Sequence, residues 1–322
     1  MRAVIAKLGQ ALLLIIAVIV LNFLLIQIAP GDPADVIASA SGGTTPEIMA
    51  EIRAQYGLDQ PLWTQLWNYT TQMLRGDLGQ SYFLDQPVSS LIAARIGPTI
   101  LLVLSALLFA IVGGVFIGVF TARRPENPVS HGVTIFSLVG YSMPVFWTGI
   151  ILVLLFAIRF DVLPPSGMTD VKFSGGLVAK VIDIAEHLLL PAFTLGVIYL
   201  AQYSRLSRAT MLEVLGSDYV RTARAKGLGE RTVVYKHALR NAVIPVVTIA
   251  GLQFGALLSG ALLVETVFNW PGLGRLAFDS LLRRDHPVLL GILFMSALLV
   301  IIANLLTDLA YRLIDPRIRV GG

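Results

Sequence analysis

The sequence predicts an all-α, polytopic membrane protein with six transmembrane helices. Of its 322 residues, 56% are hydrophobic and only 14% are charged, and the mean hydropathy is +0.77, far from the balance of a soluble domain. The apolar residues gather in six segments, each approaching the roughly 20 residues that a helix needs to cross a ~30 Å hydrocarbon core. These segments lie at about 11–29, 99–122, 133–158, 188–204, 243–264 and 288–311.

The first segment is predicted to be a permanent membrane anchor, although it has features of a signal peptide. Arg2 and Lys7 precede it, and Ala38-Ser39-Ala40 resembles a cleavage site. However, its apolar stretch exceeds the ~7 to 15 residues of a signal core, and a Pro-Gly-Asp-Pro sequence at 30–33 intervenes. We therefore expect residues 1–29 to form the N-terminal segment and the first transmembrane helix.

The distribution of charge predicts the orientation of the chain. Most of the 24 lysines and arginines lie in the N-terminus, the second and fourth loops and the C-terminal tail, whereas the loop at 30–98 is rich in acidic residues. By the positive-inside rule, both termini and the fourth loop are cytoplasmic, and the region 30–98 is exterior. The remaining part, 99–322, is predicted to be a five-helix core with a cytoplasmic loop at about 205–240, which we call the elbow.

The exterior region is long enough to contain local structure. The residues from Pro46 through Tyr56 are predicted to form a short amphipathic helix that ends at Gly57. Apolar residues from Trp63 to Met73 form a helical stripe before Gly76. Such a stripe is typical of packing on neighbouring helices or at the membrane interface.

The elbow is a basic, helix-forming stretch in an otherwise apolar protein. Ser217 is a suitable N-cap for a short helix that Gly227 should end, and a second helix is predicted to follow from Glu230. Pro245 favours a bend where this helix meets the next apolar segment. The small residues of the elbow predict a surface that settles closely into a groove on a partner protein, with basic side chains around its rim.

Two other interpretations of the elbow are open. Lysines and arginines beside a membrane helix are most often a topology signal that also contacts anionic lipid. A basic helix–turn–helix also resembles a DNA reader, but apolar segments tether the elbow on both sides and leave no room for a separate domain. We therefore expect no nucleic-acid partner.

The residues that are missing exclude several classes of function. The chain has no GxxxxGK[ST] phosphate loop, no cysteine and no histidine spacing typical of a metal site, so we expect no catalytic residue, no cofactor and no bound metal. Ser142 follows the start of a GxSxG pattern but precedes Met143-Pro144, which favours a kinked helix over a nucleophile. Glu265 lies at the outer end of the fifth segment, and no acidic residue occupies an evident midplane position, which weakens a proton- or sodium-driven mechanism.

The elbow also resembles the EAA-type cytoplasmic loop of ABC importer permeases, in the form found in the dipeptide, oligopeptide and nickel family. The resemblance rests on DYVRTARAKGL and HALRNAVIPVV, and extends to PGDPAD, YGLDQPL, RGDLGQSY, PVFWTGI, LPPSG, ETVFNWPGLGRL and DPRIR, covering nearly the whole chain. The exterior loop is similar to that of the B-type subunit. Where the general loop has Glu-Ala-Ala, this chain has Arg221-Thr222-Ala223, as is typical of the peptide and nickel branch.

This resemblance implies the fold of a type I ABC importer permease in a bacterial inner membrane. It implies a heterodimer with a second homologous permease subunit, two cytoplasmic ABC ATPase subunits that bind the elbows, and an extracytoplasmic substrate-binding protein. It also implies a dipeptide or oligopeptide as the substrate, with glutathione and nickel complexes as alternatives. The residues that match the coupling loop are Tyr219, Arg221, Thr222, Ala223, Ala225, Lys226, Gly227 and Leu228.

Two further classes remain as alternatives. A membrane-embedded enzyme is disfavoured by the missing nucleophile, metal and acid–base groups. A self-sufficient channel or secondary transporter is the other alternative. Co-purification of a nucleotide-hydrolysing partner would discriminate among the three.

Overall fold

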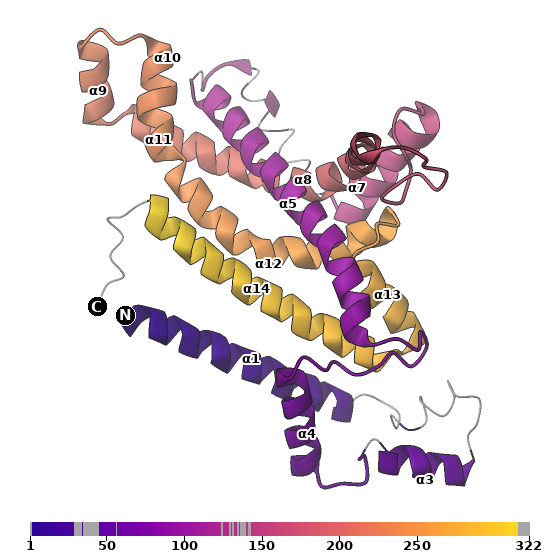
Figure 1. The fold of residues 1–322 in the computed structure, drawn as a ribbon. Coiled ribbons are helices and arrows are strands. Elements are labelled where there is room, and N and C mark those ends of the chain that lie inside the picture. The colour runs from indigo at the N-terminus through magenta and orange to yellow at the C-terminus, as the bar shows by residue number, and fades with distance from the viewer. Residues whose placement is uncertain are drawn as a thin grey trace. The chain divides into compact units, whose positions relative to one another are not determined.

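The computed structural model describes residues 2–28, 34, 45–55, 57–123, 125–128, 130, 132–133, 135, 140 and 143–314. In these ranges the regular elements are helical, apart from one isolated bridge between Gln80 and Pro87, and the all-α prediction is confirmed. The helices are α1 Arg2–Ile28, α3 Pro46–Gln55, α4 Leu62–Leu74, α5 Val88–Arg123, α7 Val145–Leu152, the π-helix η1 Val153–Arg159, α8 Leu177–Leu215, α9 Asp218–Ala225, α10 Glu230–Thr232, the π-helix η2 Val233–Ala238, α11 Leu239–Ala242, α12 Ile244–Val267, α13 Leu273–Arg283 and α14 His286–Ile314 (Figure 1).

Four of these helices, α1, α5, α8 and α14, are long and apolar enough to cross a membrane. The pair Glu230–Gly251 and Gln253–Val267, bent by 55°, makes a fifth candidate span. The segment predicted at 133–158 contains the shorter apolar helix Val145–Arg159, and much of its first half lies outside the described residues. The membrane class is therefore confirmed, and the count of six spans stays a prediction.

Two of the predicted apolar segments are shorter than the helices that contain them. The segment predicted at 188–204 lies inside the 39-residue helix α8, and α5 begins at Val88 instead of near 99. Hydropathy detects only the part of a helix that matches the hydrocarbon, whereas backbone hydrogen bonding continues through the flanking polar residues. The structure describes α3 and α4 as predicted, and Gly57 and Gly76 follow them with positive φ angles of 64° and 79°.

The helix is interrupted beside Pro245, where α11 ends at Ala242 and α12 begins at Ile244. Pro245 is in the first turn of α12, where a missing N–H removes no intrahelical hydrogen bond. A bend of 55°, which was not predicted, lies further along, between Gly251 and Gln253. A Cβ atom on Gly251 would collide with the side chain of Thr307 in α14, so glycine is needed for this close approach.

The chain divides into two compact units, which we describe separately. The first comprises residues 1–97, 276–305 and 315–322. Within it, the buried Asp285 carboxylate accepts hydrogen bonds from Ser81 Oγ (2.5 Å) and from the Tyr82 amide (3.3 Å). Asn22 of α1 donates to the Leu290 carbonyl of α14 over 3.1 Å. The Asp285 bonds fix the Ser81–Tyr82 part of the 30–98 region beside the start of α14, and the Asn22 bond joins α1 to α14.

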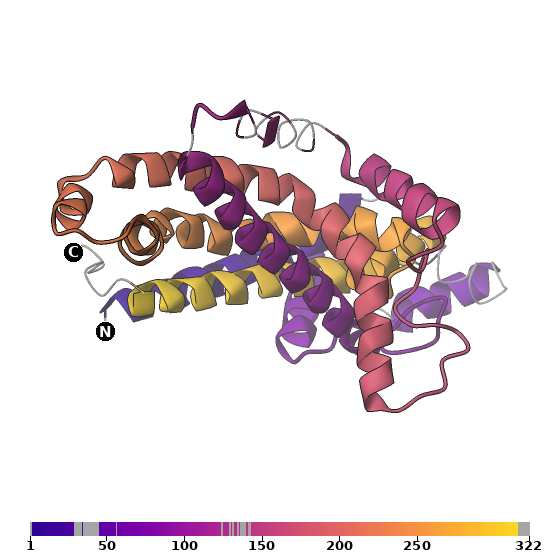
Figure 2. The same cartoon turned by 90° about the horizontal axis from the view of Figure 1, so that it is seen from above.

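The second unit, residues 98–275 and 306–314, contains the elbow. In it α5 and α8 cross closely at two glycines. A Cβ atom added to Gly114 of α5 would lie 3.0 Å from the Leu200 carbonyl oxygen, and a Cβ atom added to Gly196 of α8 would lie 2.8 Å from the Ala106 carbonyl oxygen. Helices α8 and α12 run side by side (Figure 2). Between them Gln253 donates to Gln202 over 3.1 Å, so this glutamine bonds between helices.

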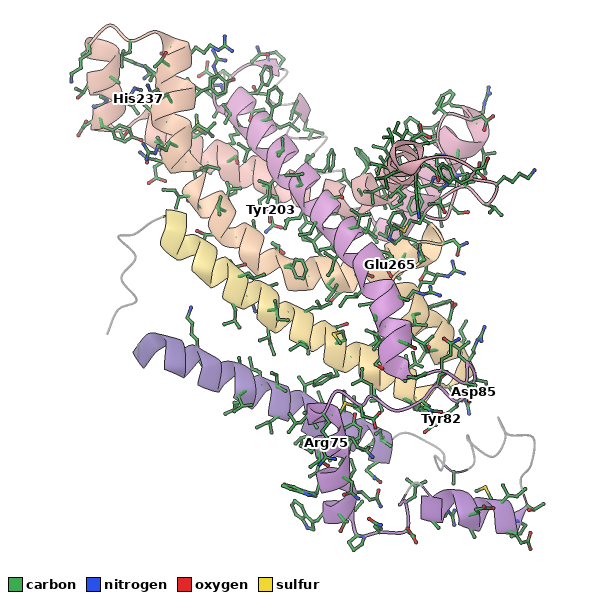
Figure 3. The ribbon with its side chains drawn as sticks, in the orientation of Figure 1. Arg75, Tyr82, Asp85, Tyr203, His237 and Glu265 are labelled. Atoms are coloured by element: carbon green, nitrogen blue, oxygen red, sulfur yellow. The ribbon has the colours of Figure 1, made fainter. Side chains whose placement is uncertain are left out.

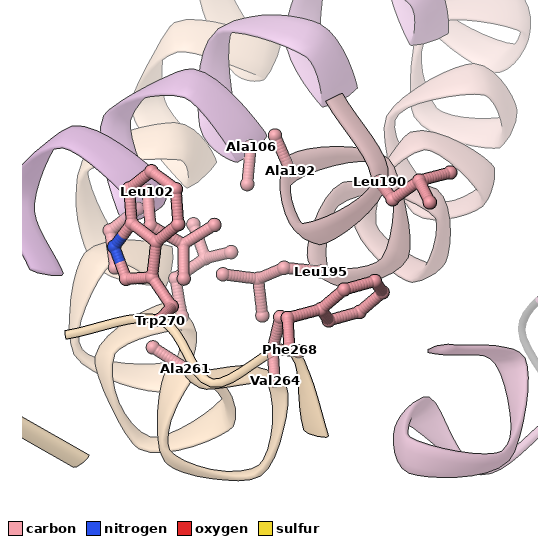
Figure 4. Packing of buried hydrophobic residues seen from close by; sticks show 11 residues of the cluster. Leu102, Ala106, Leu190, Ala192, Leu195, Ala261, Val264, Phe268 and Trp270 are labelled. Atoms are coloured by element: carbon pink, nitrogen blue, oxygen red, sulfur yellow. The ribbon is translucent and has the colours of Figure 1, made fainter. Parts of the chain in front are cut away.

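A buried apolar cluster joins α5, α8 and α12 (Figure 4). Trp270 is fully buried there and donates its indole N–H to the Pro98 carbonyl over 2.9 Å. The labelled side chains of the cluster converge from segments that are far apart in the sequence: Leu102, Ala106, Leu190, Ala192, Leu195, Ala261, Val264, Phe268 and Trp270. This cluster holds α5, α8 and the end of α12 together within the unit.

Candidate functional site

In the structure, residues 205–215 of the predicted loop belong to α8. The elbow itself consists of two short limbs joined by a turn, α9 and the α10–η2–α11 segment (Figure 1). Gly227 follows α9 with φ +77°, a left-handed conformation that a side chain would strain, so the predicted end of the helix is confirmed. Ser217 has the extended backbone of an N-cap. The predicted N-cap position is therefore confirmed, although the Ser217 hydroxyl donates to the Val214 carbonyl of α8 (2.5 Å) and forms no hydrogen bond to a backbone amide of α9.

One face of α9 is buried against the chain's own helices. Val220 and Ala223, three residues apart and therefore on one face, are 0% and 7% exposed. They pack into a cluster whose other buried members are Val119, Ala122, Met211, Val233, Val234, Ala238 and Ala242. Ala223 therefore contacts this chain, and the prediction that it fits into a partner's groove needs correction. Its small size permits the close packing of α9 on its own base.

The other predicted coupling residues lie on the outer surface of the elbow. Tyr219 is 43% exposed and Leu228 is 40% exposed. The exposed members of the set are Tyr219, Arg221, Thr222, Ala225, Lys226, Gly227 and Leu228. The structure thus brings seven of the eight predicted residues onto one accessible surface, where their role in docking stays a prediction.

An ion pair closes the turn between the limbs. Arg224 donates through Nη2 to Glu230 Oε1 (2.8 Å) and through Nε to Oε2 (3.2 Å). Hydrogen bonding to Arg224 lowers the pKa of Glu230, and the same bond raises the pKa of Arg224. Glu230 is ionised at neutral pH, so the ion pair is formed there. Its contribution to stability is lost as the pH falls through the lowered pKa of Glu230. Both groups are exposed, so the pair orients the turn more than it stabilises the fold.

This pair was missed by the sequence analysis. Residues 224 and 230 are six positions apart with a glycine turn between them, and helical periodicity points only to partners three or four apart. Two further bonds hold the limbs. Asn241 Nδ2 donates to Tyr219 Oη over 2.8 Å, and Thr210 of α8 donates to the Ala242 carbonyl over 3.0 Å. The first bond joins α9 to α11, and the second ties the elbow to α8.

A second polar constellation lies at the other end of α12, around Glu265 (Figure 3). The carboxylate is 0% exposed and accepts hydrogen bonds from Thr99 Oγ1 (2.6 Å), the Gly274 amide (2.7 Å) and the Arg275 amide (3.1 Å). The amides belong to the first turn of α13, where a negative charge is favourable. A Cβ on Gly272 would collide with this carboxylate. Glu265 therefore anchors α13 and the preceding loop to α5.

The comparisons with known proteins decide the family. A family model described as the binding-protein-dependent transport system inner membrane component matches residues 114–320, which include the whole elbow. The chain belongs to this family. A second model, described as the N-terminal part of the membrane component, matches residues 1–105. The prediction of a permease, a transport subunit and not an enzyme, is confirmed.

The permease is similar along its whole length to peptide permeases. It is 40% identical to the dipeptide transport system permease protein DppB of Escherichia coli (strain K12) over 336 aligned positions, 99% of each chain. It is 41% identical to the di/tripeptide permease DppB of Pseudomonas aeruginosa (strain UCBPP-PA14), over 97% of each chain. The oligopeptide permease AppB of Bacillus subtilis (strain 168) is 37% identical over 95% of each.

Solved structures support the fold. The permease matches a chain of the inward-facing MetNI methionine ABC transporter with a TM-score of 0.55 and 17% identity, covering 70% of the permease and 96% of that chain. It also matches a chain of an amino acid ABC transporter with histidines, with a TM-score of 0.51, 15% identity and coverage of 70% and 94%. At these identities the likeness concerns the fold alone, and it confirms the predicted permease-like architecture.

Proposed function

We propose that this permease is the B-type subunit of an ATP-driven, binding-protein-dependent importer of dipeptides or oligopeptides. The observation that carries the proposal is the 40% identity to a dipeptide permease over 99% of both chains. The permease would form the translocation path with a second, homologous subunit. Two cytoplasmic ABC ATPases would bind the two elbows, and an extracytoplasmic binding protein would deliver the peptide.

The elbow is suited to transmit motion between an ATPase and the spans. Its exposed surface is available for docking, while Val220 and Ala223 bind it to the cluster under it. The Thr210 hydrogen bond continues this connection to α8, and the Asn241 hydrogen bond joins α9 to α11, the helix that precedes α12. We infer that a displacement of α9 moves these helices as one body, so that closure of the ATPases exchanges inward- and outward-open states.

The same proposal includes the organisation of the chain. Residues 1–29 form the anchor, 30–98 the exterior region, and 99–322 the permease core with the elbow at about 205–240. The permease lies in the inner membrane with both termini cytoplasmic, surrounded by lipid and without nucleic acid. The distribution of lysine and arginine supports this orientation.

Purification with and without partners tests the function. We expect the isolated permease neither to bind nor to hydrolyse ATP, because it has no phosphate-cradling loop. When it is co-expressed with its partner subunits and reconstituted, ATP hydrolysis should rise on addition of the binding protein loaded with a dipeptide. Stoichiometric ATP binding by the contaminant-free permease, or hydrolysis that no peptide stimulates, would contradict the proposal.

Cysteine labelling tests the orientation. The chain contains no cysteine, so single cysteines at Gln72 in α4 and at Thr232 in α10, both exposed, provide unique probes. In intact cells a membrane-impermeant thiol reagent should label Gln72→Cys, and it should label Thr232→Cys only after the membrane is opened. The reverse pattern would overturn the topology.

A further inference from the structure

A basic pocket lies between the end of α5 and the second limb of the elbow. Arg123 is the last residue of α5, Arg231 belongs to α10 and Tyr235 to η2, and the three line a cavity of about 440 Å³. The Arg123 guanidinium carbon lies 6.0 Å from the centre of the Tyr235 ring, within the range of a cation–π contact. The pocket therefore joins two segments more than 100 residues apart.

The charge of the pocket is positive. Glu230 precedes Arg231 in the chain, but Arg224 engages both of its carboxylate oxygens. Among the described residues, neither Arg123 nor Arg231 forms an ion pair, and both are exposed. Guanidinium groups with free donors bind phosphate oxygens strongly, because their fork geometry matches two oxygens at once. An anion with a phosphate group fits this pocket.

An apolar stripe on α5 leads to the same pocket. From Leu104 to Phe120 every fourth residue of the helix is bulky, apolar and exposed, and Leu108 and Phe116 are 65% and 67% exposed. The stripe consists of Leu104, Leu108, Val112, Phe116 and Phe120. It ends three residues before Arg123, whereas Gly114 and Gly118 of the same helix pack against α8. In a membrane protein, an exposed stripe of large apolar side chains is suited to contact lipid chains.

We propose that the pocket binds the headgroup phosphate of an anionic phospholipid whose acyl chain lies along the α5 stripe. A lipid would occupy the pocket with its headgroup and the stripe with its acyl chain. An acidic segment of an ATPase would occupy the pocket alone, so the presence of both features favours a lipid. The inference rests on the cytoplasmic elbow of the proposed function, because anionic lipids attract basic segments at that membrane face. A bound lipid would bridge α5 and η2 and hold the second limb of the elbow in place.

Native mass spectrometry of the whole transporter tests this site. The complex is reconstituted in nanodiscs made of an equal mixture of phosphatidylethanolamine and phosphatidylglycerol, and the lipids that remain on the permease after release are counted. We expect retention of phosphatidylglycerol over phosphatidylethanolamine. In the double variant Arg123→Ala/Arg231→Ala, retention should fall about thirtyfold, as expected for two basic side chains at an anionic lipid surface.

The matched control is Arg159→Ala, which removes an exposed arginine at the end of η1, outside the pocket. This variant should retain phosphatidylglycerol as the wild type does.

Equal retention by the wild type and the double variant would overturn the proposal. Displacement of the lipid by inorganic phosphate alone would show a site for a soluble anion instead, and would also overturn it. So would loss of ATPase subunits with unchanged lipid, which would assign the pocket to ATPase docking. Because the spectra report the ATPase subunits separately, a failure of the proposed assembly is distinguishable from a failure of the lipid site.

Discussion

Ala225→Glu is expected to leave the permease in the membrane at the wild-type level and to abolish most peptide uptake. Ala225 is exposed in the last turn of α9, whereas the buried face carries Val220 and Ala223. A glutamate at 225 should therefore not disturb the fold of the permease. In a close contact with an ATPase, the new carboxylate would lose water without gaining a partner, which costs about 1–3 kcal/mol or more. We expect ATPase association to weaken tenfold or more.

Three quantities decide this prediction when they are measured on the same membranes: the amount of permease, the amount of ATPase that co-purifies with it, and peptide uptake. Ala179→Glu is the matched control, since Ala179 is also an exposed helical alanine but lies in the first turn of α8. Wild-type uptake by Ala225→Glu would show that the elbow is only a topology signal that contacts lipid, and the coupling proposal would be wrong.

Two other variants separate the structure of the elbow from its docking surface. Ala223→Glu places a charge in the buried cluster, so it should lower the amount of folded permease as well as uptake. In Gly227→Val the new side chain would not collide with any neighbour. Residue 227 must, however, keep a φ angle of +77°, which costs a valine about 1–2 kcal/mol. We expect it to reduce ATPase co-purification partially. Its membrane level should stay close to normal, since the strain is confined to an exposed turn.

Glu265→Ala is expected to cause the largest loss of folded permease among single changes. The substitution would leave the Thr99 hydroxyl and the Gly274 and Arg275 amides without their acceptor in a buried site. Each buried donor without a partner costs about 1–3 kcal/mol, so the total should be several kcal/mol. The permease should then accumulate poorly, and its thermal unfolding in detergent should occur at a clearly lower temperature.

Two variants control this experiment. Glu265→Gln keeps the shape and one acceptor oxygen, so its loss of stability should be intermediate. Glu186→Ala removes an exposed carboxylate of α8 and should have little effect. If Glu265→Ala were as stable and abundant as the wild type and yet failed to transport, the carboxylate would act in transport instead of anchoring α13.

The sequence alone determined the class of the protein and its local helices. The apolar segments showed a multi-span membrane protein, because only a helix satisfies every backbone hydrogen bond within the hydrocarbon. Glycine positions predicted where α3, α4 and α9 end, and the structure places Gly57, Gly76 and Gly227 at positive φ. These features depend on a few neighbouring residues, and such short-range preferences can be read from the sequence.

The tertiary structure decided which side of each helix is used. Ala223 was predicted to touch a partner, but it is buried in a cluster that includes Val119 and Ala122 of α5, about 100 positions away. The Arg224–Glu230 pair, the Glu265 anchor on Thr99 and the bend beside Gly251 likewise depend on approaches between segments that no local pattern encodes. The spacing of apolar residues shows which face of a helix is buried, but it does not show which other segment packs on that face. That choice belongs to the packing of the whole unit, where distant segments compete for the same contacts.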